Sequence, residues 1–191
     1  MSINLQLNSS VLIQGLDNPL ASAAIGRMQI CGTNIVGIVS AGQGGQVFGN
    51  LLDMIRLLRQ ARISNTLILG SGSAGIIIPD QLLLGIYQPQ LFSTGKVAIV
   101  SRNQSLTAEI ASELNHANLG QSIVIHIGSD PLVGCSSKLW LEWLQSDPLT
   151  EAIVLVGDIC WDSEGETATY LSAKQGKPVV AYLAGIHANT P

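Results

Sequence analysis

The chain has 191 residues, a formal net charge of −4, and 12% charged residues, whereas globular domains usually have about 25%. Its nine basic residues are scattered, which argues against nucleic-acid binding, and no apolar run approaches the roughly 20 residues of a transmembrane segment. The three cysteines are far apart and form no CxxC pair, so we expect a cytoplasmic protein without a metal site or a disulfide framework.

Short β-branched runs alternate with helical stretches along the chain. Strands are predicted over Val11–Gln14, Asn34–Val39, Asn65–Leu69, Lys96–Val100, Ser122–Ile127, Ala152–Val156 and Pro178–Leu183. Helices are predicted over Leu51–Arg62, Ser105–Asn115, Ser136–Gln145 and Ser163–Gln175. Between the third and fourth strands, an apolar stretch with a turn at Pro79 and Asp80 indicates a short β excursion. This alternation predicts an α/β fold with buried parallel strands.

The loop after the first strand has the frame of a phosphate site and residues that oppose phosphate. Gly15 is followed by Asp17, Asn18 and Pro19, and then by an Ala-rich helix. A phosphate site needs free backbone amides, usually from glycines, whereas Asp17 repels an anion and Pro19 has no amide hydrogen. We therefore expect that the loop persists for strand–helix packing and that no anion has to bind there.

Several longer segments resemble the alpha subunit of succinyl-CoA synthetase, which is a succinate–CoA ligase. The clearest matches are IGSDP at Ile127–Pro131, DPLTEAIVLVGDI at Asp147–Ile159 and KPVVAYLAG at Lys177–Gly185. The resemblance implies a shortened Rossmann-like, CoA-binding-type domain over residues 1–92. It implies a flavodoxin-like, ligase-type domain over residues 93–191, truncated before the phosphohistidine helix. The family couples nucleotide hydrolysis to thioester formation and pairs with a beta subunit.

The coenzyme A motifs of the family are only partly present. The family's GFTGxQG loop aligns with Gly15–Ala21, where its later glycines are Asn18 and Ala21, and its TPGKGG aligns with Ser40–Gly45, where Gln43 replaces the lysine. Each lost charge-assisted hydrogen bond weakens binding by about 1.5–3 kcal/mol. The resemblance leaves a degenerate set of candidate cofactor-binding residues, at Gly15, Ser40, Gly42, Gln43, Ser101, Asn103 and Ser105. We expect no bound cofactor, with coenzyme A as the alternative.

The family's chemistry is also incomplete. Its SRSGTLTYE motif aligns with residues 101–109, where the tyrosine is Ala108, and its orienting glutamate aligns with Asp158. Its phosphorylated histidine lies in a GHAGA segment, which does not align with His187 in the sequence GIHANTP. A covalent phosphoenzyme needs its nucleophile. We therefore assign no catalytic residue, and we expect that the chain does not carry out ADP- or GDP-forming succinate–CoA ligation by itself.

Three hypotheses follow. The first is a non-catalytic relative of the alpha subunit that binds another protein, either a ligase beta-type subunit or a second copy, as the low charge content also suggests. Trp140 and Trp143, three residues apart on one helix, are its candidate partner-binding residues, with core packing as the alternative. The second is a regulatory module that binds a CoA ester or a nucleotide. The third is a ligase alpha-type subunit that is active only with a partner chain.

Overall fold

The computed structural model describes residues 11–14, 19–31, 33–39, 51–63, 66–70, 72–130, 132–158, 163–173 and 176–184. In chain order the elements are β1 (Val11–Gln14), α1 (Pro19–Ile30), β2 (Ile35–Val39), α2 (Leu51–Ile63), β3 (Gly75–Ile78), β4 (Leu82–Gly85), a 3-10 turn (Pro89–Leu91), β5 (Thr94–Ser101), α3 (Gln104–His116), β6 (Gln121–His126), α4 (Ser137–Ser146), β7 (Ala152–Asp158), α5 (Ser163–Ala173) and β8 (Val179–Ala184). The predicted α/β fold class is confirmed.

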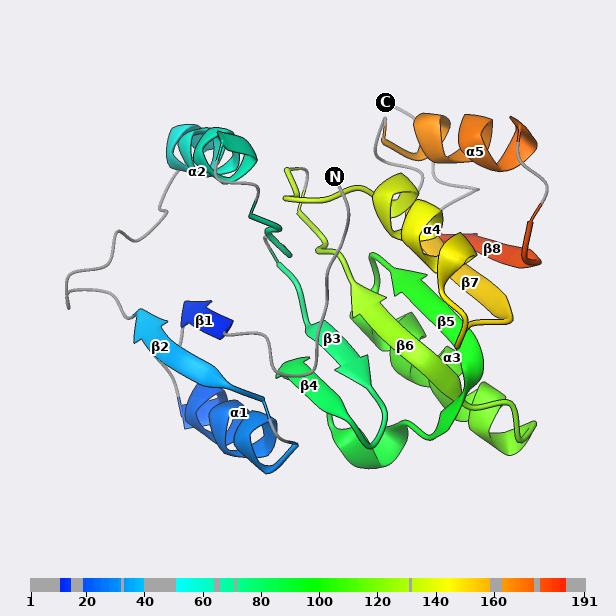
Figure 1. The fold of residues 1–191 in the computed structure, drawn as a ribbon, viewed down its shortest axis with the longest axis horizontal. Coiled ribbons are helices and arrows are strands. Elements are labelled where there is room, and N and C mark those ends of the chain that lie inside the picture. The colour runs from blue at the N-terminus through cyan, green and yellow to red at the C-terminus, as the bar shows by residue number, and fades with distance from the viewer. Residues whose placement is uncertain are drawn as a thin grey trace.

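The main sheet has six strands in the order β4-β3-β6-β5-β7-β8 (Figure 1). Strands β6, β5, β7 and β8 run parallel to one another, whereas β3 is antiparallel to both β6 and β4. Strands β1 and β2 form a separate parallel pair. None of the helices in the described part of the chain has the length and apolar character that crossing a membrane requires.

Helices cover both faces of the main sheet. Alternate residues of β5 supply the two sides, so Ala98 and Val100 belong to one buried cluster and Ile99 belongs to the other. The first cluster includes residues of α4, and α5 lies on the same side (Figure 1). The second cluster includes Ala111 of α3 and Met28 of α1. The helix α1 therefore packs on the sheet that lies mostly in the second half of the chain.

Nearly all predicted strands and helices are present, with ends that are exact or shifted by at most two residues. The strand predicted over Asn65–Leu69 is wrong for its described residues, because no neighbouring strand pairs with them there. Gly70 donates to the Ile127 carbonyl at 3.3 Å, and Leu67 and Leu69 pack against the first cluster. The apolar pattern that predicted a strand here reflects core packing without a ladder of hydrogen bonds.

The predicted β excursion is confirmed as the β3–β4 hairpin, with its turn at Pro79 and Asp80. The other end of the hairpin brings Gly75 opposite Gly85, with backbone φ angles of +104° and +134°. A Cβ on Gly75 would lie 1.8 Å from the Leu84 carbonyl oxygen. Because the hairpin pairs with β6, the sheet includes residues on both sides of the predicted domain boundary at 92/93, which itself stays a prediction.

Candidate functional site

The carboxyl ends of β5, β6 and β7 form the edge at which a site is expected. The chain passes from β5 to β6 on one side and from β7 to β8 on the other, so the connections that follow the neighbouring strands β5 and β7 run in opposite directions. In open α/β sheets, ligands bind at the carboxyl ends of the strands beside such a switch point. Ser101, Arg102 and Asn103 lie at this position between β5 and α3.

The beginning of α3 is closed by its own side chains. The Asn103 side chain accepts a hydrogen bond from the Leu106 amide at 3.0 Å, which is an N-cap. The buried Ser101 hydroxyl bonds the backbone amide and carbonyl of Asn103, each at 2.9 Å. The Thr107 hydroxyl donates to the same Asn103 carbonyl at 2.6 Å. These contacts fix the first turn without any ligand.

The structure brings together only part of the predicted cofactor-binding set. Ser101 and Asn103 are neighbours at the end of β5, and Ser105 is exposed in the first turn of α3. The other four candidates lie outside the described residues, at Gly15, Ser40, Gly42 and Gln43. The predicted role of the seven residues therefore stays a prediction.

Loss of the Asn103 cap is expected to weaken the fold measurably. We expect Asn103→Ala to lower the free energy of unfolding by about 1 kcal/mol, because the Leu106 amide loses its acceptor. Asn103→Ser is the matched control and should retain most of the stability, since serine also caps helices. Urea unfolding followed by circular dichroism measures both variants. Equal losses in the two variants would contradict the capping role.

Arg102 is a buried cation that sequence reasoning missed. Its side chain is almost fully buried, and its Nη2 atom donates to the Asp130 carbonyl oxygen at 2.7 Å. Its backbone amide donates to the Val156 carbonyl of β7 at 3.0 Å. A buried cation needs acceptors, because desolvation is costly. One feature of the sequence could have indicated this burial: Arg102 directly follows a predicted strand whose residues are apolar on both faces.

His126, at the end of β6, is a buried neutral histidine. Its Nδ1 atom accepts a hydrogen bond from the Ala74 amide at 2.8 Å, which places the ring proton on Nε2. Nε2 is buried and makes no hydrogen bond of good geometry to the described residues. Burial lowers the pKa of His126; the Arg102 backbone opposes this shift, and the Arg102 charge adds to it. His126 is therefore a core histidine at the end of its strand.

The lowered pKa of His126 predicts a pH-dependent stability. Below the ordinary histidine pKa of about 6.5, His126 is protonated in the unfolded chain but stays neutral in the folded chain. The free energy of unfolding is therefore highest above this pH and decreases below it. The loss per pH unit is at most about 1.4 kcal/mol for one proton. We expect His126→Gln to flatten the change between about pH 7.5 and 5. Urea midpoints across this range measure it, and an unchanged slope in the variant contradicts it.

The two tryptophans of α4 have different environments. Trp140 is fully buried, and its indole nitrogen donates to the Cys135 sulfur at 3.1 Å. Trp143 is partly buried and meets Trp140 edge to face, with ring centroids 6.0 Å apart. Burial raises the pKa of the Cys135 thiol to about 11, which leaves it a poor nucleophile. Trp140 therefore packs in the core, which was the alternative to partner binding. Of the two tryptophans, only Trp143 has exposed surface that a partner could contact.

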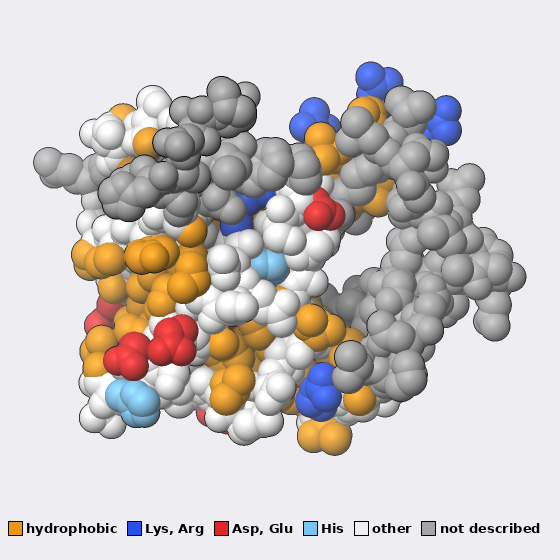
Figure 2. Space-filling view, turned by 180° about the vertical axis from the view of Figure 1, so that it is seen from behind, with side chains coloured by type: hydrophobic (Ala, Val, Ile, Leu, Met, Phe, Trp, Pro, Cys, Tyr) orange, Lys and Arg blue, Asp and Glu red, His pale blue; other side chains and the backbone are white. Residues whose placement is uncertain are grey.

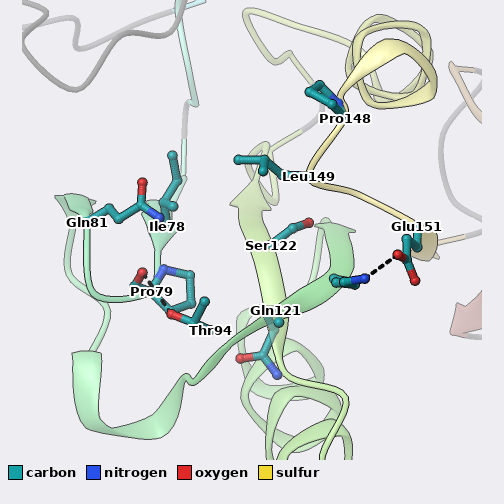
Figure 3. A pocket seen from close by; sticks show the side chains of 11 residues that line it. Ile78, Pro79, Gln81, Thr94, Gln121, Ser122, Pro148, Leu149 and Glu151 are labelled. Carbon is teal, nitrogen blue, oxygen red and sulfur yellow. Dashed lines mark hydrogen bonds and ion pairs between the residues drawn. The ribbon is translucent and has the colours of Figure 1, made fainter.

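A pocket of about 330 Å³ lies at the opposite, amino-terminal ends of β5 and β6. Its walls include Ile78, Pro79 and Leu149 (Figure 3). Lys96 and Glu151 form an ion pair at its rim with an Nζ–Oε1 distance of 2.5 Å, and both side chains are largely exposed. An exposed pair of this kind contributes at most about 1 kcal/mol. The lining contains no histidine or cysteine, and its charged side chains are the exposed pair of Lys96 and Glu151.

Within the described ranges, no three His, Cys, Asp or Glu side chains gather as metal ligands would.

No family model matches the chain. It is nonetheless 40% identical over 124 residues to the succinate–CoA ligase [ADP-forming] alpha subunit of Aquifex aeolicus, covering 65% of this chain and 41% of that one. It is 35% identical over 181 residues to alpha subunit 2 of the same enzyme from Archaeoglobus fulgidus, covering 95% and 60%.

Solved structures show the same fold. The apo form of the dinucleotide-forming acetyl-coenzyme A synthetase 1 of Ca. Korarchaeum cryptofilum matches with a TM-score of 0.68 at 16% identity, over 94% of this chain and 51% of that one. ATP citrate lyase from Methanothrix soehngenii, in complex with citrate and coenzyme A, matches with a TM-score of 0.65 at 17% identity, over 94% and 30%.

The chain spans 41% of the length of the Aquifex aeolicus subunit and 60% of the length of the Archaeoglobus fulgidus subunit, which is about half. The malate–CoA ligase alpha subunit of Methylorubrum extorquens falls between them, with 32% identity over 174 residues and 57% of its length matched. Similarity at this level extends over most of the present chain. The chain therefore belongs to the succinate–CoA ligase alpha-subunit family.

Proposed function

We propose that this chain is a non-catalytic alpha-type subunit that acts by binding another protein, in first place a ligase beta-type subunit. The observation that carries the proposal is the closed first turn of α3. In the family that it resembles, this helix opens toward the phosphohistidine. Here Asn103 stands in the Ser-Gly pair of the family motif, and its side chain occupies the Leu106 amide that an anion would need.

The described histidines support the same proposal. His116 is exposed at the far end of α3, where the helix carries its partial negative charge. His126 is buried with Nδ1 occupied by the Ala74 amide. A phosphoryl acceptor needs an accessible, unprotonated nitrogen aimed at the donor. His126 is not accessible, and His116 lies at the opposite end of α3 from the turn at Asn103.

Co-expression with the succinate–CoA ligase beta subunit of the same organism tests the proposal directly. We expect a stable one-to-one complex, no acid-labile phosphate on this chain after incubation with labelled ATP, and no CoA-dependent turnover. Trp143→Ala should weaken the complex, whereas Glu142→Ala on the exposed side of α4 should not. Labelling of this chain, or turnover by the complex, would favour the alternative of an alpha-type subunit that is active with its partner.

A second candidate is a module that binds a CoA ester or a nucleotide. It is favoured by the names of the relatives, which are CoA ligases, and by the fold shared with a lyase solved with coenzyme A. Coenzyme A at about 100 times its Kd would stabilise the fold by about 2.7 kcal/mol. Thermal unfolding with coenzyme A, succinyl-CoA, ADP and ATP separates the candidates. We expect no shift at millimolar ligand. The cytoplasm stays the proposed location, on the ground of the cysteine pattern.

A further inference from the structure

The pocket at the amino-terminal ends of β5 and β6 lies apart from the α3 terminus and from the tryptophans of α4. Its volume of about 330 Å³ is at the lower end of the range for ligand pockets, about 300–1,000 Å³, and therefore suits a small molecule. Ile78 and Pro79 lie on one side of it, and Glu151 lies on the other (Figure 3). Pro148 and Leu149 add to the apolar wall. The pocket therefore has an apolar end and a charged end.

The charged end is the ion pair of Lys96 and Glu151, and the backbone keeps these two residues together. Thr94 and Val97 of β5 both lie opposite Gln121 of β6, so the two residues between them form a bulge. Bulges often re-aim side chains beside binding sites. Within this bulge, the Lys96 carbonyl accepts a hydrogen bond from the Glu151 amide at 2.8 Å. The two opposite charges are therefore neighbours by construction of the sheet.

A pair of opposite charges beside a pocket stands out in this chain, because charged side chains are few. They make up 12% of the residues. On the face seen from behind, the described surface is largely apolar or uncharged (Figure 2). Lys96 and Glu151 are both largely exposed, and an exposed ion pair contributes little to stability and costs little to open. Both charges are therefore available to a ligand.

Ser122 adds a hydrogen-bond acceptor to the lining of the pocket. The Thr150 hydroxyl donates its proton to the Asp147 carboxylate at 2.6 Å. The hydrogen bond of 2.7 Å between the Ser122 and Thr150 hydroxyls is then donated by Ser122, since a hydroxyl has a single proton. The Ser122 oxygen keeps its lone pairs for an N–H donor, as the Glu151 carboxylate does.

We propose that this pocket binds a free amino acid with an apolar side chain, such as leucine. The ligand's carboxylate accepts a hydrogen bond from Lys96, and its ammonium group donates to Glu151 and Ser122. Its side chain packs against Ile78 and Leu149 at the apolar end. A ligand with both charges gives each member of the ion pair an opposite charge, whereas a ligand with one charge leaves the other member unpaired or facing a like charge. The proposal is independent of the proposed ligase-related function, since it uses no residue of the α3 terminus or of α4.

Isothermal titration calorimetry of the purified chain with L-leucine, without any other subunit, tests the proposal. We expect saturable binding with a Kd of about 1 mM or lower, which is within reach of a ligand of this size. Glycine lacks the apolar side chain and should bind at least about tenfold more weakly. 4-Methylpentanoate, which is leucine without its ammonium group, should also bind at least about tenfold more weakly. No saturable binding of leucine, or equal binding of leucine and 4-methylpentanoate, overturns the proposal.

A charge variant tests which protein group meets the ammonium of the ligand. Glu151→Gln should weaken leucine binding at least about tenfold. The same variant should bind 4-methylpentanoate more tightly than the wild type does, because Lys96 loses its competing carboxylate and the ligand loses a repelling one. Glu166→Gln, exposed on α5, is the matched control and should leave both affinities unchanged. A Glu151→Gln variant that binds leucine like the wild type overturns the proposal.

Nuclear magnetic resonance locates the ligand without relying on a variant. Addition of leucine should shift the amide resonances of Ser122 and Leu149, which line the pocket. The amide resonance of Asn103, at the carboxyl end of the same sheet, should stay in place. Shifts at Asn103 with none at Ser122 or Leu149 would place the ligand outside this pocket and overturn the proposal.

Discussion

Trp140→Ala is expected to lower the free energy of unfolding by about 3–5 kcal/mol, enough to unfold much of the protein at ambient temperature. The indole ring is fully buried between the sheet and α4, and its nitrogen bonds the Cys135 sulfur. Truncation removes the apolar contacts of the ring and leaves a cavity in a cluster that also contains Val100 and Leu141. Urea unfolding monitored by circular dichroism measures the loss without relying on tryptophan emission.

Trp143→Ala is the internal comparison for this prediction. The two residues are of the same type, on the same helix and in edge-to-face contact, but Trp143 is only partly buried. We expect a loss of about 1–2 kcal/mol, because less of its surface leaves water on folding. Stabilities that fall equally in the two variants would show that α4 does not pack as described. The comparison also separates a role in folding from the partner contact proposed for Trp143.

Gly85→Ala is expected to destabilise the protein by at least about 3 kcal/mol. Gly85 has a φ angle of +134°, and a Cβ there would lie 2.2 Å from the Ala74 carbonyl oxygen. The obstacle is backbone of the paired strand, opposite Gly75, so it cannot move without opening the hairpin. Heating scans should show a lower midpoint, and the hairpin amides should exchange with deuterium earlier than those of β5.

Gly26→Ala is the control with the opposite sign. Gly26 lies inside α1, and a Cβ built there meets nothing within 4 Å. Alanine is favoured over glycine inside a helix by about 0.8–1 kcal/mol, so this variant should be more stable than the wild type. A stabilising Gly85→Ala, or a Gly26→Ala that costs several kcal/mol, would contradict the backbone described for these two glycines.

Most of the fold was accessible from the sequence because periodicity reports burial. The parallel strands around Ile99, Val124 and Leu155 are buried on both faces and read as continuous β-branched runs. The 66–70 segment has similar residues but no strand partner. Pairing depends on distant parts of the chain, and a local pattern does not contain that information. For the same reason, the pairing of the β3–β4 hairpin with β6 was not predicted.

The candidate site was less accessible from the sequence. Asn103 and Ser105 were considered because they align with a family motif at the start of a predicted helix, and the cap formed by Asn103 follows from its place just before that helix. The hydrogen bond of the Arg102 side chain could not be predicted from the local sequence, because its acceptor, the Asp130 carbonyl, lies 28 residues away along the chain. The burial of Trp140 was one of two open alternatives, because residues three apart on a helix share a face whether that face is inside or outside.

Met28 and Ala24 of α1 belong to one buried cluster with Phe92 and Val124. This packing has a thermodynamic consequence. Because an early helix completes the apolar layer of a later sheet, neither stretch can lose its structure without exposing the other to water. Melting should therefore be cooperative across residues 19–184, with a single calorimetric peak whose van't Hoff and measured enthalpies agree. Proteolytic cleavage near residue 92 should give two fragments that remain associated until both unfold.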